Sequence, residues 1–138
     1  MARVILHRLA GTKKALHACR LVEKLYLAGR RVAVWLADER KAQLFDQYLW
    51  TFADESFVPH SLVRGDQDGG EDPVILITGS LSGTSVVDVL VLLDVPDNLD
   101  GLRGFYEVHD LITTAPEDVG RVEAWHGAGF EVTEVRGG

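Results

Sequence analysis

The feature that most constrains the fold is the regular alternation of two kinds of segment along the chain. Short runs rich in valine, leucine and isoleucine alternate with longer segments whose apolar residues recur at helical spacing. Such alternation is typical of a largely parallel sheet with helices on both faces. It predicts an α/β protein, a three-layer α/β/α sandwich with a mostly parallel sheet. We expect strands at residues 4–9, 31–36, 73–78, 86–93, 105–112 and 130–135, and helices at 13–28, 39–51 and 116–125.

Individual residues mark where several of these elements begin and end. Thr12 and Asp38 precede the first two helices and suit helix N-caps, and Gly29 follows the first helix as a C-terminal glycine does. The run 86–93 is the most apolar, so we predict a central strand that is buried on both faces. Residues 52–64 are predicted to be irregular, and an acidic, glycine-rich surface loop is expected to follow them.

Composition limits the class of protein. The chain has 138 residues, enough to bury a core without disulfides or metals, and we expect a single domain over residues 1–138. Hydrophobic residues make up 46% and charged residues 25%, which argues against intrinsic disorder. Cys19 is the sole cysteine, which excludes an internal disulfide and a zinc site built on several thiolates. No apolar run approaches the ~20 residues that span a bilayer, and we expect a soluble cytoplasmic protein without a membrane partner.

Charge is distributed unevenly along the chain. Residues 1–31 contain eight of the 14 basic residues and one of the 21 acidic residues, although the net charge is −7. A net acidic chain is repelled by the phosphate backbone, which argues against general nucleic-acid binding. On the first predicted helix, one stripe is basic and the opposite side is apolar. The stripe is either a solvated face or a binding site for an acidic partner, and it comprises Lys13, His17, Arg20 and Lys24.

The sequence contains no clear catalytic or phosphate-binding motif. The first strand is followed by one glycine, Gly11, where the dinucleotide-binding fingerprint needs three. Residues 79–85 lack the lysine of a Walker A loop and lead into a strand. The five histidines lie singly on different elements, and Asp94 and Asp97 at a strand end have no metal partner. We therefore expect no cofactor, no metal site and no catalytic residue.

Aromatic residues cluster at and beyond the end of the second helix. Trp50, Phe52 and Phe57 lie close together in the sequence, and Pro59 follows them. These side chains can seal the edge of the sheet. Alternatively, they can form a platform for an apolar anchor of a partner, because aromatic residues are enriched in interfaces.

The same segment resembles a known family. The pattern L-D-x-x-L-W, followed a few residues later by S-F-x-P-H, is found in the chi subunit of bacterial DNA polymerase III holoenzyme. Here Phe45 stands at the first leucine position, and the other positions are filled by Asp46, Leu49, Trp50, Ser56, Phe57, Pro59 and His60. Further similarities are Gly29-Arg30-Arg31-Val32, the paired runs 73–76 and 88–90, and Ala128-Gly129-Phe130. The resemblance therefore covers nearly the whole chain.

The resemblance implies a Rossmann-like fold without a nucleotide-binding loop, and a non-catalytic role in DNA replication. Chi proteins link the clamp loader, through the psi subunit, to the acidic C-terminal tail of the single-stranded-DNA-binding protein. DNA is then contacted mainly indirectly, through that protein. We predict that the aromatic segment forms the psi side of the chain, with the contact residues Trp50, Phe57, Val58, Pro59 and His60.

The last helix departs from the family pattern for tail binding. Family members supply several lysines and arginines there, whereas this helix has a single arginine among acidic residues. An acidic tail that ends in a hydrophobic residue needs cationic groups and an apolar socket. The predicted tail-binding residues are Arg121, Trp125 and His126, helped by Arg20 and Lys24 of the basic stripe.

Other functions are compatible with the sequence. One alternative is a small nucleotide- or phosphate-binding α/β enzyme that uses the carboxyl ends of its strands, and another is a protein-interaction domain outside replication. A response to mononucleotides would distinguish the first from an adaptor, and affinity for the tail would distinguish the second. Direct DNA binding is disfavoured by the net charge.

Overall fold

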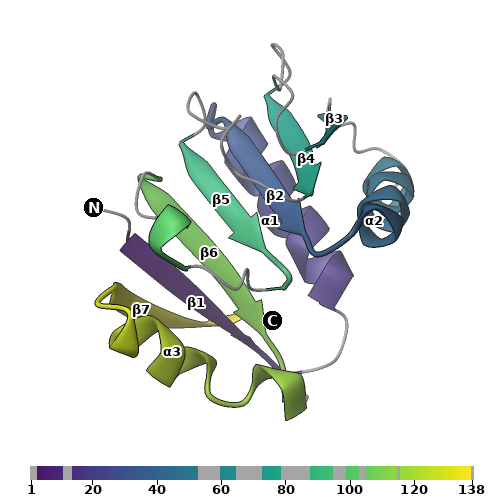
Figure 1. Ribbon diagram of the computed structural model, residues 1–138. Coiled ribbons are helices and arrows are strands. Elements are labelled where there is room, and N and C mark those ends of the chain that lie inside the picture. The colour runs from purple at the N-terminus through teal and green to yellow at the C-terminus, as the bar shows by residue number, and fades with distance from the viewer. Residues whose placement is uncertain are drawn as a thin grey trace.

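Seven strands form one sheet in the computed structural model of the chain (Figure 1). The structure describes residues 3–10, 14–52, 60–64, 73–78, 88–94, 99–102, 105–114 and 116–137. The strands are β1 (Arg3–Leu9), β2 (Val32–Leu36), β3 (His60–Arg64), β4 (Val74–Thr78), β5 (Val89–Leu92), β6 (Glu107–Ile112) and β7 (Glu131–Gly137). The α-helices are α1 (Lys14–Leu27), α2 (Glu39–Thr51) and α3 (Arg121–Gly127), and two short 3-10 helices are η1 (Leu99–Leu102) and η2 (Pro116–Asp118).

The strand order is β3-β4-β2-β5-β6-β1-β7, and each of the six pairings is parallel. Val32 of β2 is in register with Val74 of β4 on one side and with Val89 of β5 on the other. β5 lies fourth in the order, and all of its residues are buried. The predicted central strand is therefore confirmed, and it is shorter than the predicted range 86–93.

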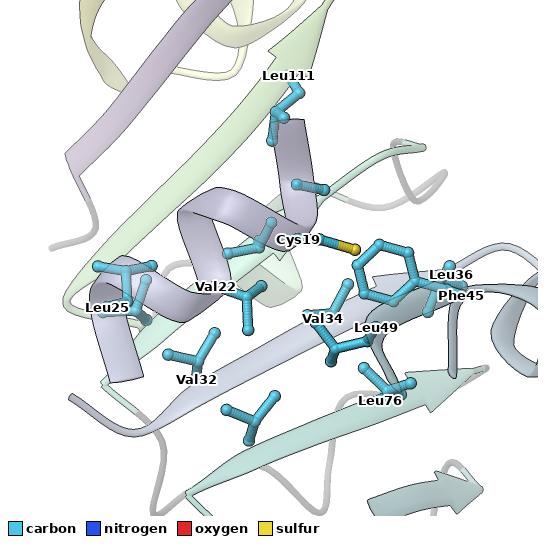
Figure 2. Packing of buried hydrophobic residues seen from close by; sticks show 14 of the residues in the cluster. Cys19, Val22, Leu25, Val32, Val34, Leu36, Phe45, Leu49, Leu76 and Leu111 are labelled. Atoms are coloured by element: carbon cyan, nitrogen blue, oxygen red, sulfur yellow. The ribbon is translucent and has the colours of Figure 1, made fainter. Parts of the chain in front are cut away.

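Buried apolar residues form two clusters, one on each face of the sheet. On one face, Val22 of α1 and Phe45 of α2 pack in the same cluster as Val34 of the sheet (Figure 2). The second cluster contains Leu102 of η1 and Trp125 of α3. Figure 1 shows α1 and α3 on opposite sides of the sheet. The predicted three-layer α/β/α sandwich is confirmed.

Local signals in the sequence explain the ends of the first two helices. Gly29 follows α1 with a φ of +80°, a conformation in which other residues are strained. The Asp38 carboxylate caps α2 by accepting a hydrogen bond of 2.8 Å from the backbone N–H of Lys41. Both predicted ends are confirmed, whereas the predicted cap Thr12 lies outside the described residues.

Two elements differ from the prediction. Residues 60–64, within the stretch predicted to be irregular, form the edge strand β3, which pairs in parallel with β4. The predicted helix 116–125 is divided, because η2 ends at Asp118 and α3 begins after Gly120. Gly120 has a φ of +87°, and a residue in this left-handed region cannot continue a right-handed helix. The last helix is therefore limited to the seven residues of α3.

A chain of polar side chains connects β1 to the buried strand β6. His7 Nε2 lies 2.7 Å from His109 Nδ1, and the two rings stack with 5.0 Å between their centroids. His109 Nε2 lies 2.6 Å from the carboxylate of Glu107, to which Arg3 donates a hydrogen bond of 3.2 Å. Two neutral imidazoles satisfy this arrangement if His109 donates to Glu107 and accepts from His7.

We predict that this arrangement makes the free energy of unfolding fall between pH 6.5 and about pH 4. Burial, the neighbouring His109 and the charge of Lys24 lower the pKa of His7 from 6.5 to about 4. The unfolded chain therefore binds a proton at His7 in this window, whereas the folded chain does not, so acidification favours unfolding. Urea denaturation at several pH values measures the effect.

Two variants separate His7 from the other groups that titrate in this window. His7→Gln should make the pH dependence of the unfolding free energy shallower, because glutamine takes up no proton. His126→Gln, which replaces a histidine at an exposed position of α3, is the matched control. Equal pH dependence in the wild-type chain and the His7→Gln variant would contradict the prediction.

Candidate functional site

The aromatic end of α2 is held against the first residue of β3. Trp50 lies in the last turn of α2 with 45% of its surface exposed, and its ring lies 4.4 Å from that of His60, centroid to centroid. His60 is buried, and its Nε2 atom lies 2.9 Å from the Asp46 carboxylate of α2. An indole that is half exposed and held by a ring contact on its buried side can bind an apolar side chain of a partner.

The structure brings together two of the five residues predicted for the psi side. Trp50 and His60 are in ring contact, whereas Phe57, Val58 and Pro59 lie outside the described residues. The role of all five in partner binding stays a prediction.

Arg121, the predicted cation for an acidic tail, is bound by two carboxylates of its own chain. Its Nε atom donates to Asp110 Oδ2 at 3.1 Å, and its Nη2 atom donates to the other oxygen of the same carboxylate. Its Nη1 atom donates to Asp118 at 3.0 Å. Asp110 lies on β6, and Asp118 ends η2. This fork geometry is the strong bidentate pairing of arginine with carboxylate, and it fastens the start of α3 to the sheet.

Lys14, at the start of α1, completes a neutral network with these groups. Its Nζ atom lies 3.2 Å from the Asp118 carboxylate and donates to the carbonyl oxygen of Leu93 at 3.0 Å. Asp118 also accepts hydrogen bonds from the backbone N–H and the hydroxyl of Thr113, at 2.7 and 2.9 Å. The two cations balance the two carboxylates, whose side chains are fully buried.

The two carboxylates titrate differently because their surroundings differ. Burial raises the pKa of Asp110, although Arg121 and the indole N–H of Trp125 oppose this effect. Burial acts in the same direction on Asp118, but the hydrogen bonds from Thr113 and Lys14 outweigh it and lower the pKa of that carboxyl. Asp118 therefore stays ionised to lower pH.

Trp125, the predicted apolar socket, is an interior residue. It is 1% exposed, its indole N–H donates to Asp110 at 2.8 Å, and its ring meets the edge of Phe130 at 5.1 Å between centroids. His126, the third predicted tail residue on α3, is exposed. Tail binding by Arg121, Trp125 and His126 stays a prediction, with the first two turned toward the sheet.

The basic stripe on α1 is a separate surface. Arg20 and Lys24 are exposed one helical turn apart, and His17 is partly buried, whereas Lys13 lies outside the described residues. Because α1 and α3 cover opposite faces of the sheet (Figure 1), the structure does not bring Arg20 and Lys24 together with the predicted residues of α3.

The sole cysteine is buried in the core. Burial raises the pKa of the Cys19 thiol to about 12, so this thiol stays protonated and unreactive. Within the described residues, no group of three or more His, Cys, Asp or Glu side chains is arranged to hold a metal ion. Over the same residues, no helix has the length and hydrophobicity needed to cross a bilayer.

We predict that Asp110→Ala lowers the free energy of unfolding by about 3–5 kcal/mol, because it leaves the partly buried Arg121 and the Trp125 N–H without their main acceptor. Glu134→Ala is the matched control. It removes the exposed pair between Glu134 and Arg8, 2.6 Å apart, and should cost about 0–1 kcal/mol. Chemical denaturation measures both values. Asp110→Asn, which keeps the shape and one carbonyl acceptor, should fall between them, and equal costs for all three variants would contradict the prediction.

Comparison with known proteins places the chain in a family. Residues 1–125 match the family described as "DNA polymerase III chi subunit, HolC". A DNA polymerase III subunit chi of Pseudomonas aeruginosa is 42% identical over 66 residues, which cover 48% of this chain and 44% of that protein. The Escherichia coli subunit chi is 32% identical over 94 residues, covering 68% of this chain and 63% of that protein. The matched parts thus span less than two thirds of the length of these curated relatives.

The fold is also shared with more distant proteins. A C-terminal domain of S. cerevisiae Dbp5, solved with Gle1 and IP6, superposes with a TM-score of 0.63 at 14% identity and covers 98% of this chain and 90% of that chain. A structure of S. cerevisiae Dbp5 with RNA and ADP BeF3 has a TM-score of 0.64 at 13% identity, covering 99% and 41% of the two chains. At this identity the likeness shows the fold alone. The match over residues 1–125 and the two related subunits show that the chain belongs to the DNA polymerase III chi subunit family.

Proposed function

We propose that the chain is a non-catalytic accessory subunit of DNA polymerase III holoenzyme. In this role it joins the clamp loader, through the psi subunit, to the acidic C-terminal tail of the single-stranded-DNA-binding protein. The observation that carries the proposal is the family match over residues 1–125.

We propose the end of α2 as the psi side. Trp50 offers a half-exposed indole, and its contact with His60 fixes the ring before a partner arrives. A fixed anchor loses little side-chain entropy on binding, which favours a strong contact at one residue. Residues 57–59, predicted for the same side, lie outside the described residues.

We propose that the exposed cations of α1 contribute most to tail binding. Arg121 already donates to two carboxylates, so it has little attraction left for an acidic ligand, and its helix also carries the exposed Glu123. Arg20 and Lys24 face solvent one turn apart, where two carboxylates of an extended acidic segment can reach both. Because many tails are displayed along coated DNA, individually weak contacts gain through avidity.

The tail proposal predicts a charge effect that is specific to α1. Arg20→Glu should weaken the binding of a fluorescent peptide with the C-terminal tail of the host's single-stranded-DNA-binding protein by about fivefold at low salt. Arg40→Glu, the same charge reversal at an exposed position of α2, should change the affinity by less than about twofold. Fluorescence anisotropy at two salt concentrations measures these affinities.

His126→Glu tests whether an added negative charge on α3 also weakens binding of the tail peptide. A loss of tail affinity in His126→Glu with none in Arg20→Glu would move the tail site to α3. If no peptide binds even at low salt, tail binding by this chain is wrong, and the clamp-loader role is then tested by the psi side alone.

The psi proposal predicts that Trp50→Ala weakens binding to the host's psi subunit, or to its clamp-loader complex, by about tenfold or more. The fold should survive, because the indole is 45% exposed. Leu27→Ala removes another exposed apolar side chain, on α1, and should leave the affinity unchanged. Surface plasmon resonance measures the affinities, and circular dichroism checks the fold. Wild-type affinity in a folded Trp50→Ala variant would refute this placement.

A further inference from the structure

A crevice of about 520 Å³ opens where the sheet ends near the first turns of α1 and α2. This volume is within the range of sites that bind small molecules. Apolar side chains from α1, α2, β2 and the end of β5 form most of its walls: Ala15, Leu36, Leu44, Phe45, Tyr48 and Leu93. The polar side chains in its walls are Lys14, Lys41, Asp94 and Thr113.

The position of the crevice in the sheet is distinctive. β2 and β5 are neighbours, and the crevice lies at the carboxyl ends of both, beside Leu36 and Leu93. After β2 the chain continues into α2 on one face, and after β5 it continues into η1, which packs in the cluster on the other face. In the strand order, β3 and β4, which follow α2 in the chain, lie on one side of β2, and β6, which follows η1, lies on the other side of β5. Parallel α/β sheets bind ligands at such points, where the strand order reverses.

Two ammonium groups on different helices border the crevice. Lys14 Nζ has two acceptors, the Leu93 carbonyl and the Asp118 carboxylate, although an ammonium carries three N–H donors. Among the described residues, Lys41 Nζ donates to the carboxylate of Asp94, at 3.3 Å, and its side chain is half exposed. Each lysine therefore keeps a donor for an anion that enters between them. Asp94 offers an acceptor for hydroxyl groups of the same ligand.

The walls favour a flat ring over an extended polar ligand. Tyr48 is 40% exposed and Leu44 is 58% exposed, so the apolar surface of α2 continues out of the crevice to its rim. Aromatic rings gain by stacking on such surfaces, whereas a bare inorganic anion makes no use of them.

We propose that this crevice binds a nucleoside phosphate, with the base against the apolar wall of α2 and the phosphate between Lys14 and Lys41. The sequence has no glycine-rich phosphate loop, so side-chain ammonium groups replace the backbone N–H groups that such a loop supplies. Binding should therefore be reversible, sensitive to salt and without turnover of the nucleotide. This inference does not depend on the partner surfaces proposed above. Because it predicts binding without turnover, hydrolysis of the nucleotide, and not binding alone, would favour the enzyme alternative over the adaptor.

The test is a titration of the full chain, labelled with ¹⁵N, with ADP at low salt. We expect saturable chemical-shift changes that centre on residues of the crevice, and a weaker response, by about tenfold or more, to adenosine or to inorganic pyrophosphate alone. Equal affinity for pyrophosphate and ADP would overturn the nucleoside part of the proposal. Shift changes that centre on the basic stripe of α1, or no binding at millimolar ADP, would overturn the site.

Adjacent residues of α2 provide a matched pair of variants. Lys41→Gln should weaken ADP by about fivefold, the loss of one charge-assisted hydrogen bond, and its fold should persist because the side chain is half exposed. Arg40→Gln removes the same charge from an exposed side chain that does not line the crevice and should leave the affinity unchanged. Equal losses in both variants would indicate general attraction by charge and would contradict the proposal.

Discussion

The position of α3 and η2 against the sheet depends on the buried pairing of Asp110 with Arg121. Asp110 is fully buried, and an isolated carboxylate there would be very costly. Arg121 and the Trp125 indole supply its donors, so α3 has to lie against β6 in one orientation. Asp118 and Lys14 extend the same network from η2 to the start of α1. One charge-balanced cluster thus connects elements on both faces of the sheet.

This network has a consequence for partner binding. Because Arg121 pairs with two interior carboxylates and Trp125 is buried, we infer that they contribute less to binding of an acidic ligand than exposed residues do. The short helix α3 therefore turns Arg121 and Trp125 toward the interior, whereas its residues Glu123 and His126 are exposed. Exposed cations outside this network include Arg20 and Lys24 on the outer side of α1, and the half-exposed indole of Trp50 lies at the end of α2. The two proposed partner surfaces therefore lie on α1 and α2, two helices that pack against the same face of the sheet.

The network also connects to the crevice at the carboxyl ends of the strands. Lys14 contacts Asp118 of the network and lines the crevice at the same time. An anion that binds Lys14 would therefore contact a residue whose hydrogen bond to Asp118 helps to position η2. α2 carries the other lysine of the crevice near its first turn and Trp50 in its last turn, so both ends of this helix face proposed ligands.

Much of the fold could be predicted from the sequence, because the signals concerned are local. Helical spacing on α1, the Asp38 cap and the continuous apolar runs of β4 and β5 depend on neighbouring residues only. β3 was missed because an edge strand is defined by its pairing with β4, and its sequence shows no apolar alternation. The division of the last helix follows from the left-handed conformation of Gly120, which its sequence position alone does not reveal.

The candidate site was harder to predict, because its properties depend on contacts across the sheet. An arginine and a tryptophan at helical spacing suit a binding face as well as a core anchor, and the sequence alone does not show that both donate to Asp110. The contact of His7 with His109 joins residues that are 102 positions apart. Only the strand order makes them neighbours. Trp50 was recognised because its signal, an aromatic residue at a helix end in a family motif, is local.

The most direct test of the central claim is to map the tail peptide onto the ¹⁵N-labelled chain by NMR. If α3 is committed to the interior, chemical-shift changes should centre on Arg20 and Lys24 of α1, and the side-chain signals of Arg121 and Trp125 should stay unchanged. Changes confined to Arg121, Trp125 and His126, with none on α1, would show that α3 opens to receive the tail and would contradict the claim.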